Sequence, residues 1–181
     1  MNLYILRHAS AGVRRLNPLL DVKRPLDKEG KTHCLHLAYV LNAMKLNFDL
    51  VVSSPLKRSL QTAQLVATET GYETKILISN ALAPAANFSH FQRLLRECGA
   101  YENVLVVGHN PNLSAFLGQL VAGAAEADGV PVTRIRLRKG SLARLSFGRG
   151  PTVLQYLLDP RIVGALYTTS IKSSRRKTSR K

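Results

Sequence analysis

Short apolar runs alternate along this chain with longer stretches of helical periodicity. The runs lie at residues 3–6, 48–52 and 103–108, with a weaker one at 75–79. Each has the length and the valine, leucine and isoleucine content of one buried strand. The run at 103–108, Asn-Val-Leu-Val-Val-Gly, is the strongest of these signals. We therefore predict four strands in the first 110 residues.

Between these runs the apolar positions follow a helical period. They predict helices over 28–44, from Ser53-Ser54-Pro55 to residue 70, over 89–98 and over 112–121. Asp27 is a typical N-cap, the serines before Pro55 indicate a helix start, and glycines follow two of the predicted helices. Residues 10–27 show no clear period and are predicted to form a long loop.

The last third of the chain has a different pattern. We expect a loop at 123–131 and a half-exposed strand at 132–137, where arginines alternate with apolar residues. Two further strands, 142–147 and 152–158, flank Gly148-Arg149-Gly150 and predict a hairpin. Alternating strands and helices indicate an α/β fold with a mostly parallel sheet and one antiparallel element. We expect one domain over 1–165 and a basic, disordered tail over 166–181.

Composition narrows the class of protein. The chain has 181 residues, enough for one good core, and no apolar run near the roughly 18 residues that span a bilayer. We see no signal peptide and expect a cytoplasmic protein without a membrane partner. The formal net charge is +15, to which the basic residues of 172–181 contribute 6. The remaining +9 suits phosphorylated or otherwise anionic partners.

The cysteines and the clustered histidines offer little chemistry. Cys34 and Cys98 are far apart in apolar contexts, and we expect two buried thiols without excluding a disulfide. His33 and His36 lie three residues apart on a predicted helix, with no further ligand nearby. We therefore expect no metal site.

Charged side chains follow the predicted strands where those strands end. Arg7 and His8 come directly after the first run, and His109 follows the run at 103–108. Arg58 lies in the first turn of the helix that starts after Ser53-Ser54-Pro55, where the helix dipole attracts anions. Carboxyl ends of parallel strands meet at one edge of a sheet. We expect these four side chains to converge there.

Such a cluster matches a phosphoryl group. Two guanidinium forks and a helix N-terminus bind its oxygens, and one histidine can be the nucleophile that forms a phosphorylated nitrogen. The second histidine, in its protonated form, would stabilise charge on the equatorial oxygens. The arginines neutralise charge, so the chemistry calls for no metal and no cofactor.

Three motifs in this order resemble those of the histidine phosphatase superfamily, which includes phosphoglycerate mutases and acid phosphatases. They are Leu6-Arg7-His8-Ala9, the stretch from Ser53 to Ala63 and Gly108-His109-Asn110. The resemblance implies a phosphoglycerate mutase-like fold with a minimal helical subdomain. It implies His8 as the phosphorylated nucleophile, with Arg7, Arg58 and His109 binding the phosphoryl group.

Within that superfamily the chain is most similar to short bacterial phosphohistidine phosphatases of the SixA type, which act in signalling. This resemblance rests on Asp21-x-x-Arg24-Pro25-Leu26, on the chain length and on residues 139–143. It implies that Arg24 lines the mouth of the pocket, although Arg24 could instead pair with Asp21 in the loop. Ala9 stands where the superfamily usually has glycine, which is tolerable if its backbone is ordinary.

The proton donor of mutases and many acid phosphatases is missing. Residues 81–86 read Ala-Leu-Ala-Pro-Ala-Ala, so Asp21 is the only acidic candidate near the site. An alkoxide leaving group needs a proton, whereas a phosphohistidine can carry its own. We therefore predict a phosphatase that removes phosphate from phosphohistidine in a protein, with phosphate or sulfate as pocket ligands.

Two alternatives stay open. One is a small-molecule phosphomonoesterase of the same superfamily, because the pocket motifs would be shared. The other is a non-catalytic anion-binding module for nucleic acid or polyphosphate, suggested by the charge. Regularly spaced aromatic residues for base stacking are missing, so nucleic acid is the less favoured partner.

Overall fold

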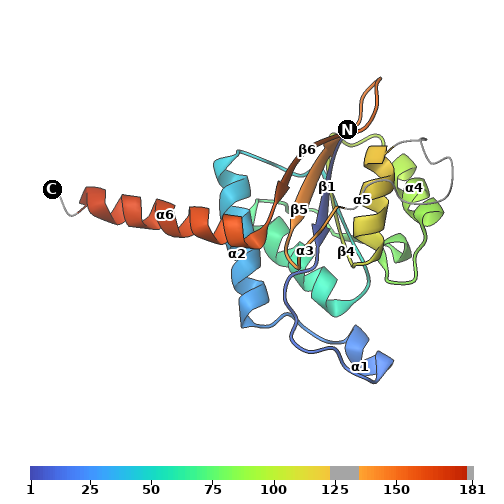
Figure 1. Cartoon of the computed structure of the whole chain (residues 1–181), viewed down its shortest axis with the longest axis horizontal. Helices are drawn as coiled ribbons and strands as arrows, with labels where there is room; N and C mark the ends of the chain where they lie inside the picture. The colour runs from blue at the N-terminus through green and yellow to red at the C-terminus, as the bar shows by residue number, and fades with distance from the viewer. Residues whose placement is uncertain (123–134, 179–181) are drawn as a thin grey trace.

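A six-stranded sheet forms the centre of the part of the chain that the structure describes (Figure 1). This computed structural model describes residues 1–122 and 135–178, with side chains to residue 170. The strands occur in the order β3-β2-β4-β1-β5-β6. Their bounds are β1 Asn2–Arg7, β2 Leu50–Ser53, β3 Leu77–Ile78, β4 Asn103–Gly108, β5 Leu142–Ser146 and β6 Val153–Leu158.

The register of the sheet places three strand ends at one level. β1, β2, β3 and β4 are parallel to one another. β5 is antiparallel to both of its neighbours, β1 and β6, which agrees with the predicted antiparallel element. Arg7 pairs with Gly108, and Ser53 pairs with Val107. The residues that follow these strands, at 8, 54 and 109, therefore emerge side by side at the carboxyl edge.

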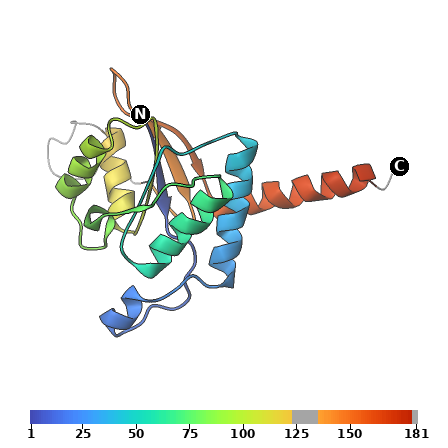
Figure 2. The same cartoon turned by 180° about the vertical axis from the view of Figure 1, so that it is seen from behind.

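Helices cover both faces of the sheet (Figures 1 and 2). One face carries α2 (Lys28–Ala43) and α3 (Lys57–Glu69), with α6 (Pro160–Thr178) packed on α2. The other face carries α4 (Phe88–Glu97) and α5 (Asn112–Ala122), whose apolar side chains pack against β1 and β4. Two buried clusters result, one on each side, and their dense packing holds the strand ends in place.

The local signals for the helices work largely as the sequence predicts. Asp27 caps α2 through its side chain, which accepts a hydrogen bond from the Gly30 amide. A Cβ at Gly30 would collide with the Ser10 carbonyl, so glycine lets the loop after β1 lie directly on α2.

Cys34 and Cys98 are buried free thiols, and burial raises the pKa of Cys34 to about 12.

Four local predictions were wrong. The 10–27 loop contains a short helix, α1 (Pro18–Val22), because the Asn17 side chain accepts from the Leu19 amide and Pro18 starts the turn. Residues 135–137 of the strand predicted at 132–137 form no strand, and the Leu137 carbonyl instead accepts a hydrogen bond from the Arg7 side chain. Residues 132–134 of that prediction lie outside the described residues. Neither serine caps α3. Its N-cap is Leu56, without a side-chain hydrogen bond.

The fourth difference concerns the tail. Residues 166–178, predicted to be disordered, continue α6 without interruption from Pro160. Val163 is buried against the α2 side of the core and anchors the first turn of this helix. The predicted loop at 123–131 lies outside the described residues. No helix in the described part of the chain is long and apolar enough to cross a membrane.

Candidate active site

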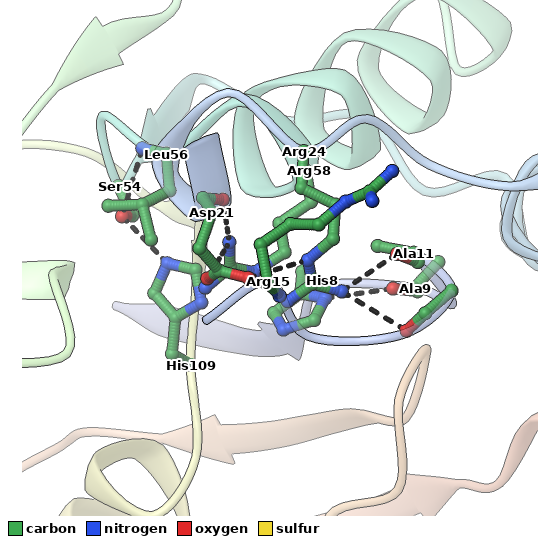
Figure 3. A network of polar contacts seen from close by, with 11 residues as sticks. His8, Ala9, Ala11, Arg15, Asp21, Arg24, Ser54, Leu56, Arg58 and His109 are labelled. Atoms are coloured by element: carbon green, nitrogen blue, oxygen red, sulfur yellow. Dashed lines mark hydrogen bonds and ion pairs between the residues drawn. The ribbon is translucent and has the colours of Figure 1, made fainter. Parts of the chain in front are cut away.

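Four parts of the chain meet at a cavity of about 840 Å³ at the carboxyl edge of the sheet. All six predicted site residues line it, from the end of β1, the 10–27 segment, the first turn of α3 and the end of β4. They are Arg7, His8, Asp21, Arg24, Arg58 and His109. Figure 3 shows five of them with their hydrogen-bond partners.

His8 is held as one tautomer. It is 6% exposed, and its Nδ1 lies 2.8 Å from the carbonyl oxygen of Ala9, to which the Nδ1–H donates. Nε2 therefore carries the free lone pair, as a nucleophile requires. Burial, followed by the charges of Arg58 and Arg7, lowers the pKa of His8 to about 3. The ring is thus neutral at pH 7.

The backbone around His8 is fixed by residues distant in sequence. The His8 amide donates to the Gly108 carbonyl, and the Ala9 amide donates to Thr62 Oγ1 at 3.1 Å. Ala9 does not adopt a positive φ, so alanine is accommodated here without strain. Gly140, at φ +80, brings its amide to the carbonyls of Arg7 and His8. These contacts fix the backbone of His8 beside the cavity.

His109 faces His8, with ring centroids 5.0 Å apart. Its Nε2 lies 2.8 Å from Ser54 Oγ, and its Nδ1 is buried without a partner. The Ser54 oxygen also accepts from the Leu56 amide at 3.4 Å. When the Ser54 hydroxyl donates to Nε2, the neutral His109 ring carries its proton on Nδ1. Burial and the nearby His8, Arg58 and Arg7 lower the pKa of His109 to about 3. His109 is therefore neutral at pH 7 and in this tautomer offers an Nδ1–H donor, not the protonated ring considered from the sequence.

The guanidinium groups of Arg7 and Arg58 each have one nitrogen that donates a hydrogen bond within the protein and one nitrogen without a partner. Arg7 Nη1 donates to the Leu137 carbonyl at 2.9 Å, and Arg58 Nη1 donates to the Asp21 carbonyl at 3.0 Å. The Nε of each guanidinium is buried and has no partner. Together with His109 Nδ1, these atoms are three unsatisfied donors on residues lining one cavity. Buried polar groups are almost always paired, so an anion is the expected partner.

Asp21 and Arg24 organise the loop over the cavity. Arg24 Nε donates to Asp21 Oδ1 at 2.8 Å, and Arg24 Nη1 donates to the Ala11 carbonyl at 2.7 Å. Desolvation raises the pKa of Asp21, but the Arg15 amide and the guanidinium groups of Arg24 and Arg58 outweigh it and lower that pKa to about 2. An aspartate so strongly ionised is a poor proton donor.

Several positioning groups were not predicted from the sequence. Ser54 was interpreted only as part of a helix-start signal, although its place in the second motif could have indicated a partner for His109. Asn110 Nδ2 donates to the same Leu137 carbonyl as Arg7, at 3.0 Å. Gln61 Oε1 accepts from the Leu26 amide at 2.8 Å and so holds the loop near α3. Lys139 also lines the cavity.

Comparison with known proteins agrees with this architecture. The model of the histidine phosphatase superfamily (branch 1) matches residues 3–83. This chain belongs to the histidine phosphatase superfamily. An uncharacterised protein of Picosynechococcus sp. is 32% identical over 126 residues, which are 68% of this chain and 74% of that protein.

Two solved structures of the superfamily are similar to this chain in fold. The protein histidine phosphatase SixA complexed with tungstate has a TM-score of 0.76 at 21% identity, over 88% of this chain and 97% of that one. The α-ribazole phosphatase of Shigella flexneri has a TM-score of 0.65 at 19% identity, over 88% and 97% of the two chains. The fold therefore serves different phosphorylated substrates. No group of three metal-ligating side chains gathers among the residues described.

Proposed function

We propose that this protein is a metal-independent phosphatase that removes the phosphoryl group from phosphohistidine in a protein, through a phosphorylated His8. The observation that carries the proposal is the set of three buried, unpartnered donors around a neutral histidine. The donors belong to Arg7, Arg58 and His109, three residues that line one cavity with His8. This arrangement suits the three equatorial oxygens of a transferring phosphoryl group.

His8 would act twice. Its Nε2 attacks phosphorus, the phosphorus–nitrogen bond of the substrate breaks, and the substrate imidazole leaves with the electron pair. Water then attacks phosphorus, the pair of the phosphorus–Nε2 bond returns to His8, and orthophosphate leaves with both protons of the water. The hydrogen bond from Nδ1–H to the Ala9 carbonyl keeps the ring oriented in both steps.

The described residues that line the cavity offer no carboxylic acid that could protonate a leaving group, which favours phosphohistidine over an alkyl phosphate as the substrate. Asp21 is ionised and bonded to arginines, and the wall formed by Ala83, Pro84 and Ala85 carries no carboxylate. A phosphohistidine protonated on its second ring nitrogen leaves as neutral imidazole and needs no acid from the enzyme. An alkoxide that leaves from an alkyl phosphate ester carries no such proton and would need one from a general acid of the enzyme.

The decisive experiment compares turnover of a phosphohistidine peptide and phosphoramidate with that of a panel of sugar phosphates. We expect kcat/KM to be far higher for the two phosphorus–nitrogen substrates. His8→Ala, prepared in parallel, should lose turnover and the radioactive phosphoryl label that the wild type acquires in a rapid quench. Equal or better turnover of sugar phosphates would establish the alternative, a small-molecule phosphomonoesterase.

A further inference from the structure

The segment at residues 13–22, which includes α1, presents apolar side chains to solvent beside the cavity. Leu19 is 76% exposed, Leu20 is 57% exposed, and α1 buries none of its residues. The described part of the chain has fourteen exposed large apolar residues, and this ten-residue segment holds five of them: Val13, Leu16, Leu19, Leu20 and Val22. In Figures 1 and 2, α1 extends away from the body of the molecule.

The segment is held in place rather than left loose. The Asn17 side chain accepts from the Leu19 amide at 2.9 Å, and Asp21 Oδ1 accepts from the Arg15 amide at 3.0 Å. Asp21 is bonded in turn to Arg24 and Arg58. Since hydrogen bonds and ion pairs fix this short helix, its leucines stay exposed instead of folding onto the core.

The apolar surface is continuous with the catalytic cavity and is basic. Leu16, Pro18 and Val22 line the cavity, together with the exposed Arg14 and Arg15. The single acidic residue of the segment, Asp21, already pairs with two arginines. A molecule that delivers its phosphoryl group to His8 must therefore contact an apolar surface bordered by unneutralised positive charge.

We propose that residues 13–22 form a docking surface for the phosphorylated protein substrate, which presents leucine-like apolar side chains and carboxylates next to its phosphohistidine. The inference rests on the proposed function and specifies the substrate class of the same site. Charge complementarity argues against a second copy of this chain, because like surfaces would bring their arginines together. Continuity with the cavity favours a phosphoprotein over a membrane.

The test uses two phosphohistidine peptides of equal length. One has leucine and glutamate on both sides of the phosphohistidine, and the other has glycine and serine there. We expect the wild type to prefer the first in kcat/KM by about tenfold, because partial burial of two leucines contributes about that factor in binding. Leu19→Ser/Leu20→Ser should lose this preference and keep wild-type turnover of the glycine–serine peptide and of phosphoramidate.

The matched control is Ile162→Ser/Leu166→Ser, two comparably exposed residues on α6, away from the cavity. This variant should keep the preference, and the melting temperatures of both variants should match the wild type, since exposed substitutions change stability little. Equal turnover of the two peptides by the wild type, or an unchanged preference in the Leu19/Leu20 variant, would overturn the docking proposal. So would loss of preference in the control.

Other occupants and the proposed function are tested separately. Flotation with vesicles of phosphatidylcholine and phosphatidylserine that depends on Leu19 and Leu20, without a peptide preference, would assign the surface to a membrane. Dimerisation in sedimentation that depends on these leucines, again without preference, would assign it to a second copy. Turnover of sugar phosphates but of neither peptide refutes the proposed function, whereas equal turnover of both peptides refutes the docking surface alone.

Discussion

Asp21 Oδ2 lies 3.2 Å from Nη1 of Arg58, so the carboxylate of the 10–27 segment contacts a guanidinium at the cavity. The Asp21 carbonyl accepts from the same Nη1. Both groups are largely shielded from solvent, with side-chain exposures of 14% and 7%. Because Asp21 engages Nη1, the Arg58 guanidinium is oriented, and its buried Nε is left without a hydrogen-bond partner.

This contact predicts how Asp21→Asn behaves. If Asp21 orients Arg58 and Arg24 and donates no proton, the substitution should lower kcat/KM modestly and by a similar factor for every leaving group. The measurement is kcat/KM for aryl phosphates of graded leaving-group pKa. A general acid would instead show a loss of about 10²–10⁴-fold confined to poor leaving groups. A steeper leaving-group dependence in the variant would therefore assign Asp21 the acid role.

Arg58 is expected to be sensitive to shape as well as charge. Arg58→Ala should reduce kcat by about 10²–10³-fold, the cost typical of losing one donor to the transition state. Arg58→Lys should recover only part of this, because an ammonium cannot both contact Asp21 and present a second, fixed donor. Steady-state kinetics on phosphoramidate measures both variants. Full recovery by lysine would mean that charge alone matters.

Ser54 should act through His109. Ser54→Ala removes the hydroxyl that lies 2.8 Å from Nε2, so the ring would no longer be held as the Nδ1–H tautomer. We expect kcat to fall by about tenfold, as for loss of one buried hydrogen bond. ¹⁵N NMR of the imidazole should change from one tautomer to a mixture. Ser89→Ala, on the exposed start of α4, is the control and should alter neither quantity.

The buried histidines predict a pH dependence of stability. The pKa values of His8 and His109 are lowered to about 3, so between pH 6.5 and 3 the unfolded chain binds protons that the folded chain does not. The free energy of unfolding should therefore fall as pH decreases through this window, by up to about 1.4 kcal/mol per pH unit for each histidine.

Urea unfolding in phosphate-free buffer measures this slope. His8→Asn and His109→Asn should each make it shallower, because each removes one group whose pKa differs between the two states. His90→Asn, at the exposed N-terminal turn of α4, is the matched control for a histidine-to-asparagine substitution outside the cavity. An unaltered slope in both active-site variants would show that folding does not lower the pKa of either histidine.

The ends of the strands and the residues that follow them could be predicted from local sequence patterns. Arg7, His8 and His109 sit next to apolar runs whose local pattern indicates parallel strands, and such strands share a carboxyl edge. The first turn of a helix is also a local property, which placed Arg58. Convergence of these residues on one cavity therefore follows from periodicity and topology alone.

The hydrogen-bond partner and the charge state of each side chain at this edge depend on contacts between distant parts of the chain. The partner of Arg7 is a carbonyl 130 residues away, His109 is oriented by a serine 55 residues away, and Asp21 meets Arg58 across 37 residues. Local pattern cannot encode such pairs, because they depend on how the loops fold over the sheet edge. The charge state of the histidines is likewise set by burial, which is a property of the packed cavity and not of the motif.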